Sequence, residues 1–314
     1  MSKLISLQKK YDSILTLYDK YLALVQKEPN NYSHKMSFAT IEKHVKELQL
    51  KIYKEKAARE KEVIELKLNV LPAYSGTLPL QLLGEIAGHL SWAVLSASQK
   101  IKEGDRLKGK IPHDIVQSLD LRFAGLSAGS SKIYLTGNVS PDLFGNSLIE
   151  DALEKIFTLL NSGDSEKLTE SASAIGIRSV IKISKLLKSI AGAELDMEVA
   201  WYSPLDKHYG WKSTKDEMIC LSNSLDKIKA SEPEIIDVEA KLIMASLKGY
   251  FEIETMKRRS YRGAIPSRIL GEIQAVHLGD ICRVKIEKKM MINQVTEFEK
   301  AYYTLLEIKA ITNS

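Results

Sequence analysis

Apolar residues near the N-terminus recur at alternating steps of three and four residues, which places them on one face of a helix. This first apolar stripe consists of Leu4, Leu7, Tyr11, Ile14, Tyr18, Tyr21 and Val25. Pro29-Asn30-Asn31 ends the helix, and a second helix with the same spacing starts near Ser37. The pattern predicts an antiparallel helical hairpin or coiled coil over residues 1–62. The stripe can pack within the hairpin or against another subunit. Its aromatic residues favour a partner surface, so we take it as the candidate oligomerisation face.

Residues 63–230 predict a central α+β domain, because alternating segments there are followed by helical ones. Two segments share the order strand, glycine-serine turn, strand, helix. The first runs over 63–70, 74–77, 78–83 and a helix to about Ile101, and the second over 119–123, 127–130, 132–135 and a helix over 142–160. The central domain is thus expected to contain two strand-turn-strand-helix units, followed by further helices and a strand pair over 194–212.

The tail, residues 235–314, follows a linker at Ser231–Glu234 and is rich in strand-forming residues. Candidate strands cover 240–247, 250–256, 261–265, 281–288 and 301–308, with a short helix over 267–276. Five strands with one inserted helix are typical of a small β-barrel of the oligonucleotide-binding (OB) or SH3-like kind. The predicted fold class is therefore α+β in three parts.

Positive charge is concentrated at the two ends of the chain. The net charge is +5, and both residues 1–62 and residues 235–314 carry more Lys and Arg than Asp and Glu. Within the tail, cationic and aromatic residues interleave, as in proteins that contact phosphates and stack on bases. The candidate nucleic-acid-binding residues are Lys257, Arg258, Arg259, Arg262, Arg268, Lys285 and Tyr261. The alternative is a solvated hairpin whose aromatic residues lie in the core.

No motif for catalysis survives inspection of its context. Gly125–Gly129 fits the G-x-S-x-G spacing, but a strand follows it where the nucleophile elbow needs a helix. Gly104–Lys110 fits a phosphate-binding loop, but Ile111 replaces the hydroxyl residue that such a loop needs for magnesium. The histidines lie singly, without a second ligand at metal-binding spacing. We therefore expect no catalytic residue, no metal site and no cofactor.

One enzymatic alternative stays open. Asp196 and Glu198 alternate on one predicted strand, and Lys207 and Lys212 follow them, which is the residue set of a diverged metal-dependent nuclease. The competing interpretation is the polar face of an amphipathic strand.

The N-terminus has no apolar leader, and polar residues interrupt the longest apolar stretch, Leu78–Ala97. Cys220 and Cys282 each lie in an apolar run, so both are expected to be buried free thiols. These features predict a cytoplasmic protein that does not contact a membrane.

Three short segments carry a resemblance: Ser118–Phe123, Gly129-Ser130 and Asp142–Gly145. With the β-rich tail, they make the chain resemble uncharacterised prokaryotic proteins encoded near phage-defence or mobile-element genes. The resemblance implies an accessory or sensor role in an antiviral system and says nothing about chemistry.

The leading hypothesis is a non-enzymatic accessory or scaffold subunit, assembled through its N-terminal helices, that contacts nucleic acid or a partner protein through basic surfaces. One alternative is an inhibitor or regulator that binds a partner enzyme. The other is the diverged nuclease.

Overall fold

The protein is described here by a computed structural model. The structure describes residues 2–29, 31–57, 61–69, 77–106, 109–127, 131–139, 147–203, 207–246, 249–294 and 298–311. The chain is mixed α+β and divides into two compact units. The first contains residues 1–84, 120–139 and 190–215, and the second contains residues 85–119, 140–189 and 216–314. The three-part division by sequence stays a prediction, and its C-terminal part, from residue 235, begins within strand β7 (Glu234–Ser246).

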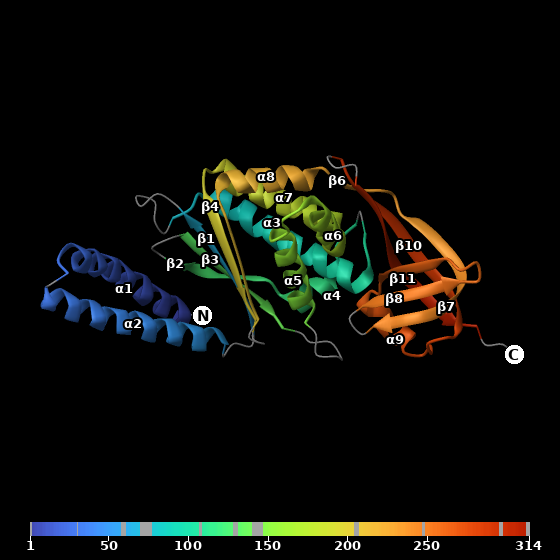
Figure 1. Ribbon diagram of the computed structural model, residues 1–314. Coiled ribbons are helices and arrows are strands. Elements are labelled where there is room, and N and C mark those ends of the chain that lie inside the picture. Colours follow the sequence, from blue (N-terminus) through green and yellow to red (C-terminus); the bar gives the residue numbers. More distant parts are fainter. Residues whose placement is uncertain are drawn as a thin grey trace. The chain divides into compact units, whose positions relative to one another are not determined.

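The first unit begins with the predicted helical hairpin, built from α1 (Ser2–Lys27) and α2 (Tyr32–Ala57) (Figure 1). The second helix starts at Tyr32, five residues earlier than expected, because the Asn31 side chain already accepts a hydrogen bond from the backbone N–H of His34 at 3.3 Å. The rings of Tyr18 and Phe38 meet between the helices with their centroids 5.0 Å apart.

A five-stranded antiparallel sheet completes the first unit. It contains β1 (Lys61–Asn69), β2 (Arg122–Ser127), β3 (Ser131–Asn138), β4 (Asp196–Tyr202) and β5 (His208–Ser213), in the order β2-β3-β1-β4-β5. Leu7 and Tyr11 of the hairpin pack against a cluster of Ile52, Val63 and Tyr134. Part of the first apolar stripe is therefore used inside the chain.

Two polar groups are buried in this sheet with partners. The carboxylate of Glu62 accepts hydrogen bonds from Trp201 Nε1 at 2.5 Å and from Ser203 Oγ at 3.4 Å. The ammonium group of Lys132 lies 3.5 Å from Glu65 and 3.7 Å from Asp12 of α1. Because buried ionised groups need such partners, these contacts tie sheet and hairpin into one unit.

The expected repeat of two strand-turn-strand-helix units is wrong for its first copy. Residues 80–83 begin helix α3 (Leu80–Glu103) and form no strand. The deciding pattern is the four-residue spacing of the buried Leu82, Ile86, Leu90 and Val94, which belongs to a helix. In the second copy β2 and β3 are present and α5 (Leu148–Leu160) begins at Leu148. Most of the first predicted turn and the predicted helix start at Ser140–Asp142 lie outside the described residues.

The second unit holds most of the remaining helices. They are α4 (His113–Leu119), α5, α6 (Ser165–Ile175), α7 (Ile177–Gly192) and α8 (Lys215–Asp226). Gly176 separates α6 from α7, because it adopts a φ of 81° that ends the first helix. Asp164 caps α6 by accepting a hydrogen bond from the backbone N–H of Lys167 at 2.8 Å.

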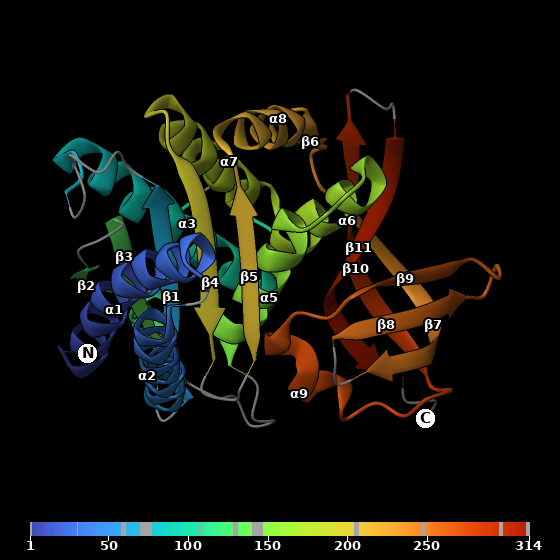
Figure 2. The same ribbon diagram turned by 60° about the vertical axis from the view of Figure 1, so that its left-hand side comes forward.

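The C-terminal strands of this unit form a six-stranded sheet (Figure 2). Its strands are β6 (Ile228–Ala230), β7 (Glu234–Ser246), β8 (Tyr250–Thr255), β9 (Ser260–Ala264), β10 (Ile281–Asn293) and β11 (Phe298–Ala310). Their order is β11-β9-β8-β7-β10-β6, and β11 also pairs with β10. A 3₁₀ turn (Ser267–Ile269) and α9 (Leu270–Ile273) lie between β9 and β10 in the chain. All five strands expected in the tail are present.

The contact between β9 and β11 is parallel, with Gly263 opposite Tyr303. A Cβ atom at Gly263 would lie 2.1 Å from the carbonyl oxygen of Tyr303 and 2.9 Å from the ring of Phe251. Only a residue without a side chain permits this approach of two backbones.

Among the described residues, no helix combines the length and apolar character needed to cross a bilayer.

We expect Gly263→Ala to lower the free energy of unfolding by about 3 kcal/mol or more, because the new methyl group forces two strands apart. Gly271→Ala is the matched control, since a Cβ there meets nothing within 4 Å. It should change stability by less than about 1 kcal/mol. Urea denaturation followed by circular dichroism measures both, and equal stability of the two variants would refute the close contact.

Candidate nucleic-acid interface

The predicted cationic segment is the tip of the hairpin between β8 and β9. Thr255 closes the tip: its N–H donates to the carbonyl of Arg259 at 2.9 Å, and its carbonyl accepts from the N–H of Arg258 at 2.8 Å. The side-chain oxygen of Thr255 also accepts from the N–H of Arg259 at 3.1 Å. Met256 and the three cations Lys257, Arg258 and Arg259 are exposed on this turn.

Arg258 adopts a φ of 58°, in the left-handed region that glycine enters without cost. A residue with a side chain is less stable in this backbone conformation than glycine by on the order of 1 kcal/mol. The cation at position 258 is therefore accompanied by local backbone strain. No ion pair is made by Lys257, Arg258 or Arg259 within the part of the chain that the structure describes. The tip therefore presents three uncompensated positive charges.

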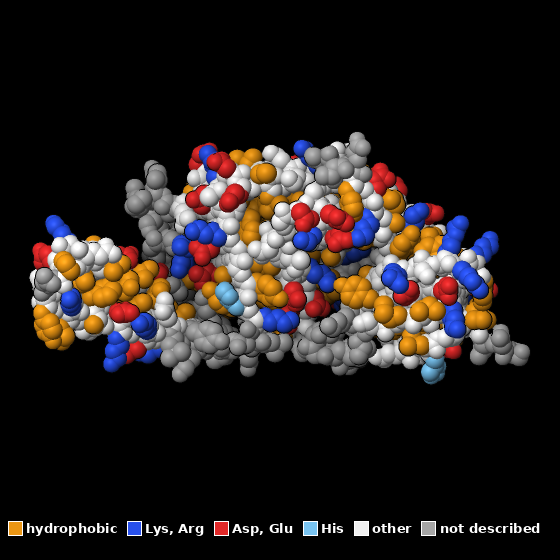
Figure 3. Space-filling model, viewed as in Figure 1, with side chains coloured by type: hydrophobic (Ala, Val, Ile, Leu, Met, Phe, Trp, Pro, Cys, Tyr) orange, Lys and Arg blue, Asp and Glu red, His pale blue; other side chains and the backbone are white. Residues whose placement is uncertain are grey.

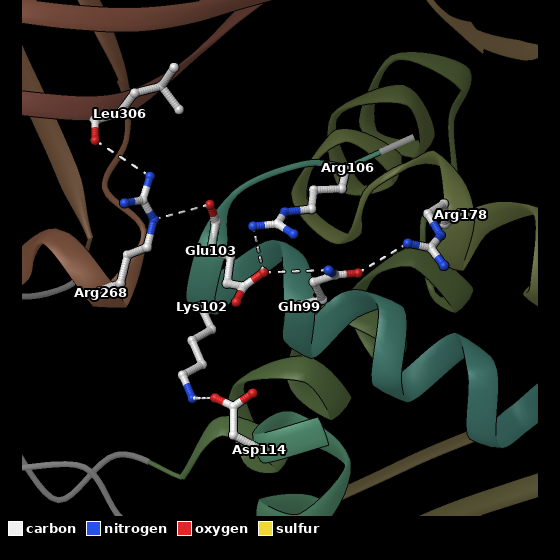
Figure 4. A network of polar contacts seen from close by, with 8 residues as sticks. All are labelled: Gln99, Lys102, Glu103, Arg106, Asp114, Arg178, Arg268 and Leu306. Atoms are coloured by element: carbon white, nitrogen blue, oxygen red, sulfur yellow. Dashed lines mark hydrogen bonds and ion pairs between the residues drawn. The ribbon is translucent and has the colours of Figure 1, made fainter. Parts of the chain in front are cut away.

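The other predicted cations are already engaged. Arg262 lies 2.9 Å from the carboxylate of Glu252, and Lys285 lies 3.1 Å from that of Glu307. Arg268 donates to the backbone carbonyls of Glu103 and Leu306, each at 3.4 Å (Figure 4). Arg268 thus ties the turn before α9 to the end of α3 and to β11, which is a structural role.

Neighbouring cations in the tail are paired in the same way. Arg283 binds Asp237, and Lys288 binds Glu234. Figure 3 shows the result, because acidic side chains lie among the basic ones over the C-terminal strands. Exposed pairs of this kind contribute little stability, about 0 to 1 kcal/mol each, but they cancel local charge.

Lys289 is buried. Its ammonium group lies 3.0 Å from Asp105 and 3.3 Å from Glu287, and it donates to the backbone carbonyl of Asp105 at 3.3 Å. Burial lowers the pKa of the nearby Lys100, which the positive charge of Lys289 lowers further, while Asp105 and Glu287 act in the opposite direction. This cluster joins the end of α3 to β10 inside the second unit and offers nothing to a ligand.

The aromatic residues are distributed differently from the prediction. Tyr261 packs against the core of the C-terminal strands and meets Tyr303 edge to face at 5.2 Å between ring centroids. Tyr250, in contrast, is 55% exposed, while Phe251 beside it is buried. Tyr250 was missed as a site residue, although the alternation of β8 carries the signal: Tyr250 shares its outward face with Glu252, whereas Phe251 faces inward. Ala264 stands opposite Tyr250 in β9, and its small side chain leaves the ring open.

The oligomerisation stripe of α1 is partly buried over Leu7, Tyr11, Ile14, Tyr18, Tyr21 and Val25, and the side chain of Leu4 lies outside the described residues. Figure 3 shows apolar side chains gathered on the visible face of the hairpin. Among the exposed large hydrophobic residues are Leu17 at 46%, Tyr32 at 75% and Met36 at 55%.

The residues of the nuclease alternative have structural partners. Asp196 accepts a hydrogen bond from the backbone N–H of Lys215 at 2.9 Å, at the start of α8, and Glu198 lies 3.3 Å from Lys67. Lys207 and Lys212 are exposed. Over the described ranges, no three His, Cys, Asp or Glu residues are grouped to hold a metal ion. Of the two thiols expected to be buried, Cys282 is buried and Cys220 is exposed on α8.

No protein-family model, curated protein or solved structure matches this chain.

We expect the buried and the exposed lysines to differ sharply in their effect on stability. Lys289→Met leaves the carboxylates of Asp105 and Glu287 buried without their cation, and should cost about 3 to 5 kcal/mol of unfolding free energy. Lys257→Met, at the exposed tip, should change it by less than about 0.5 kcal/mol. Thermal and urea unfolding measure both, and a large loss for Lys257→Met would show that the tip cations are structural.

Proposed function

We propose that this chain is a non-enzymatic subunit that binds single-stranded nucleic acid through the β8–β9 hairpin. The observation that carries the proposal is the set of three exposed cations at residues 257–259 without an ion-pair partner among the described residues. Elsewhere in the tail, Arg262, Arg283 and Lys288 each form an ion pair with a carboxylate, which compensates their charge. The tip cations remain available to phosphates, whose neutralisation dominates nucleic-acid affinity.

The strand pairing supports the same function. Counting from β7, the strands pair in the order first, second, third, fifth, fourth and back to the first. The third and fifth strands are parallel, and a helix lies between the third and fourth. On this basis we propose that residues 234–310 form a small barrel of the OB kind, which binds oligonucleotides on the face of its second and third strands. Those strands are β8 and β9, although a shared architecture alone does not establish function.

The outward face of β8 and β9 favours a single strand over a duplex. Tyr250 offers an exposed ring, and stacking on it requires a base that is not already stacked in a helix. Glu252 and Glu254 lie on β8 and repel phosphates there. Phosphates are therefore expected at the tip, and a base at Tyr250.

Reversal of the tip charges tests the proposal. The variant carries Lys257→Glu, Arg258→Glu and Arg259→Glu, and binding of a fluorescein-labelled oligonucleotide is followed by anisotropy at several salt concentrations. We expect affinity to fall by about 100-fold at low salt, and the slope of log K against log salt to become shallower by about 2, since about 0.7 counterions are released for each phosphate neutralised.

A matched control separates local contact from overall charge. Lys20→Glu, Lys27→Glu and Lys43→Glu change the net charge equally at exposed hairpin positions that make no ion pair in the described structure. This control should retain most of the affinity. Equal losses in both triple variants, or an absence of binding by the wild-type chain at low salt, would reject the proposal.

The exposed apolar side chains of the α1–α2 hairpin favour a second function, assembly with another protein or with a second copy of the chain. Two helices that pack only against each other leave part of a broad apolar stripe uncovered on each helix. Leu17 of α1 and Met36 of α2 are exposed in this way. The regulator hypothesis uses this surface as well. The link to an antiviral system stays a prediction from the resemblance.

For assembly through the hairpin, we expect the wild-type chain to sediment as a dimer or larger species at micromolar concentration. Leu17→Glu with Met36→Glu should shift it to the monomer without loss of helical circular dichroism. The control is Lys20→Glu with Lys43→Glu, polar positions of the same helices. Sedimentation velocity is the measurement, and a wild-type monomer at all concentrations would exclude self-assembly through this face.

A further inference from the structure

Another exposed aromatic residue, Trp92, lies on α3, where this helix packs against α7 in the second unit. Ser179 of α7 donates its hydroxyl to the backbone carbonyl of Ala93 in α3 at 2.8 Å, and Arg178 donates to the side chain of Gln99 at 3.1 Å. These contacts hold the two helices side by side. Trp92, next to Ala93, is 42% exposed, and Ile181 of α7 is 47% exposed.

A cation of α7 lies at this indole. The ammonium group of Lys182 lies over the ring of Trp92, 5.8 Å from its centroid. Lys185, one turn further along α7, is exposed. His89, one turn before Trp92, has a pKa below its ordinary value because of burial and because of the charges of Lys182 and Lys185, an effect that Glu85 opposes. Lys182 therefore lies at the indole, and the charges of both lysines act on the neighbouring imidazole.

The remaining cations of α7 are committed elsewhere. Lys188 pairs with Asp226, and Arg178 is held by Gln99 and by the backbone carbonyl of Gly109 at 2.9 Å. Lys182 and Lys185 form no ion pair in the described ranges. The α3–α7 surface thus carries an exposed tryptophan with Lys182 over its ring and Lys185 one turn further along α7, neither lysine having an ion-pair partner among the described residues.

We infer that Trp92, Lys182 and Lys185 form a second contact site for single-stranded nucleic acid, in which an unpaired base stacks on the indole and the lysines hold the adjacent phosphates. The inference rests on the proposed function, because it gives the same ligand a second contact. It uses none of the residues of the β8–β9 hairpin. Stacking supplies affinity without sequence preference, and the cations supply its dependence on salt.

A protein partner fits this surface less well. Protein interfaces are depleted of lysine at their centre, because the ammonium group loses its water there. Here Lys182 lies over the exposed ring of Trp92. A phosphate next to a stacked base would compensate the charge of this lysine.

The test uses the full chain and an oligodeoxythymidylate of about 20 nucleotides, long enough to reach more than one contact. Trp92→Ala should weaken binding about 10-fold, the loss expected from one stacked base. Lys182→Gln with Lys185→Gln should weaken it by a similar factor and reduce the salt dependence. Lys20→Gln with Lys43→Gln, on exposed positions of the hairpin, is the control for charge and should bind as the wild type does.

Two signals report on the site directly. The oligonucleotide should quench tryptophan fluorescence in the wild-type chain. Trp92→Phe should abolish that change, whereas Trp211→Phe, which removes the other partly exposed tryptophan, should retain it, since Trp201 is fully buried. Bound phosphate should also raise the pKa of His89, seen by NMR titration of its imidazole, because a nearby negative charge stabilises the protonated ring.

The outcomes separate this inference from the proposed function. No oligonucleotide binding by the wild-type chain rejects both. Binding that depends on residues 257–259 but is unchanged in Trp92→Ala, with no quenching and no shift at His89, overturns the second site alone. Unchanged oligonucleotide binding together with loss of a purified protein partner in Trp92→Ala assigns the surface to that protein and likewise overturns the inference.

Discussion

The parallel contact between β9 and β11 lets the C-terminal strands pair in a circuit, and it depends on Gly263 having no side chain. The carbonyl of Tyr303 occupies the space where any Cβ would lie. Without this contact β9 would be an edge strand that pairs with β8 alone. The position of the hairpin tip at residues 257–259 therefore depends on the pairing of β9 with β11.

Charge in this chain is mostly consumed by structure. Arg262, Lys285 and Lys288 face carboxylates on adjacent strands, and Arg268 binds backbone carbonyls. Lys289 is buried against Asp105 and Glu287, so its charge is part of the protein interior. A count of basic residues therefore overstates the surface available to an anion, because only cations without an acidic partner can compensate a phosphate.

Unpaired cations and exposed aromatic rings share the same elements at two places in the second unit. Residues 257–259 lie at one end of a hairpin whose other end carries Tyr250, and Lys182 lies over the ring of Trp92. Large exposed rings cost solvation free energy, and each becomes favourable once a flat partner covers it. The hairpin of α1 and α2 differs, since it exposes the aliphatic side chains of Leu17 and Met36 besides the ring of Tyr32, which suits another protein surface.

The sequence alone determined the elements whose periodicity is local. The four-residue spacing of α1, the alternation of β1 and the five strands of the tail follow from the chain, because one face of each element is apolar and the other polar. The same alternation assigned the β8–β9 turn and its cations. Periodicity was insufficient at residues 78–83, because a short leucine-rich run suits a strand and a helix equally. The burial of Ile86 and Leu90 at four-residue spacing assigns this run to a helix.

Only the tertiary structure decided which side chains are free. The pairing of Arg262 with Glu252 follows from strand register, and the burial of Lys289 follows from contact with Asp105, far away in sequence. The site at Trp92 needs α3 and α7 side by side, which no local pattern states. Periodicity reports the environment of one element, whereas the availability of a charge depends on what a distant segment brings next to it.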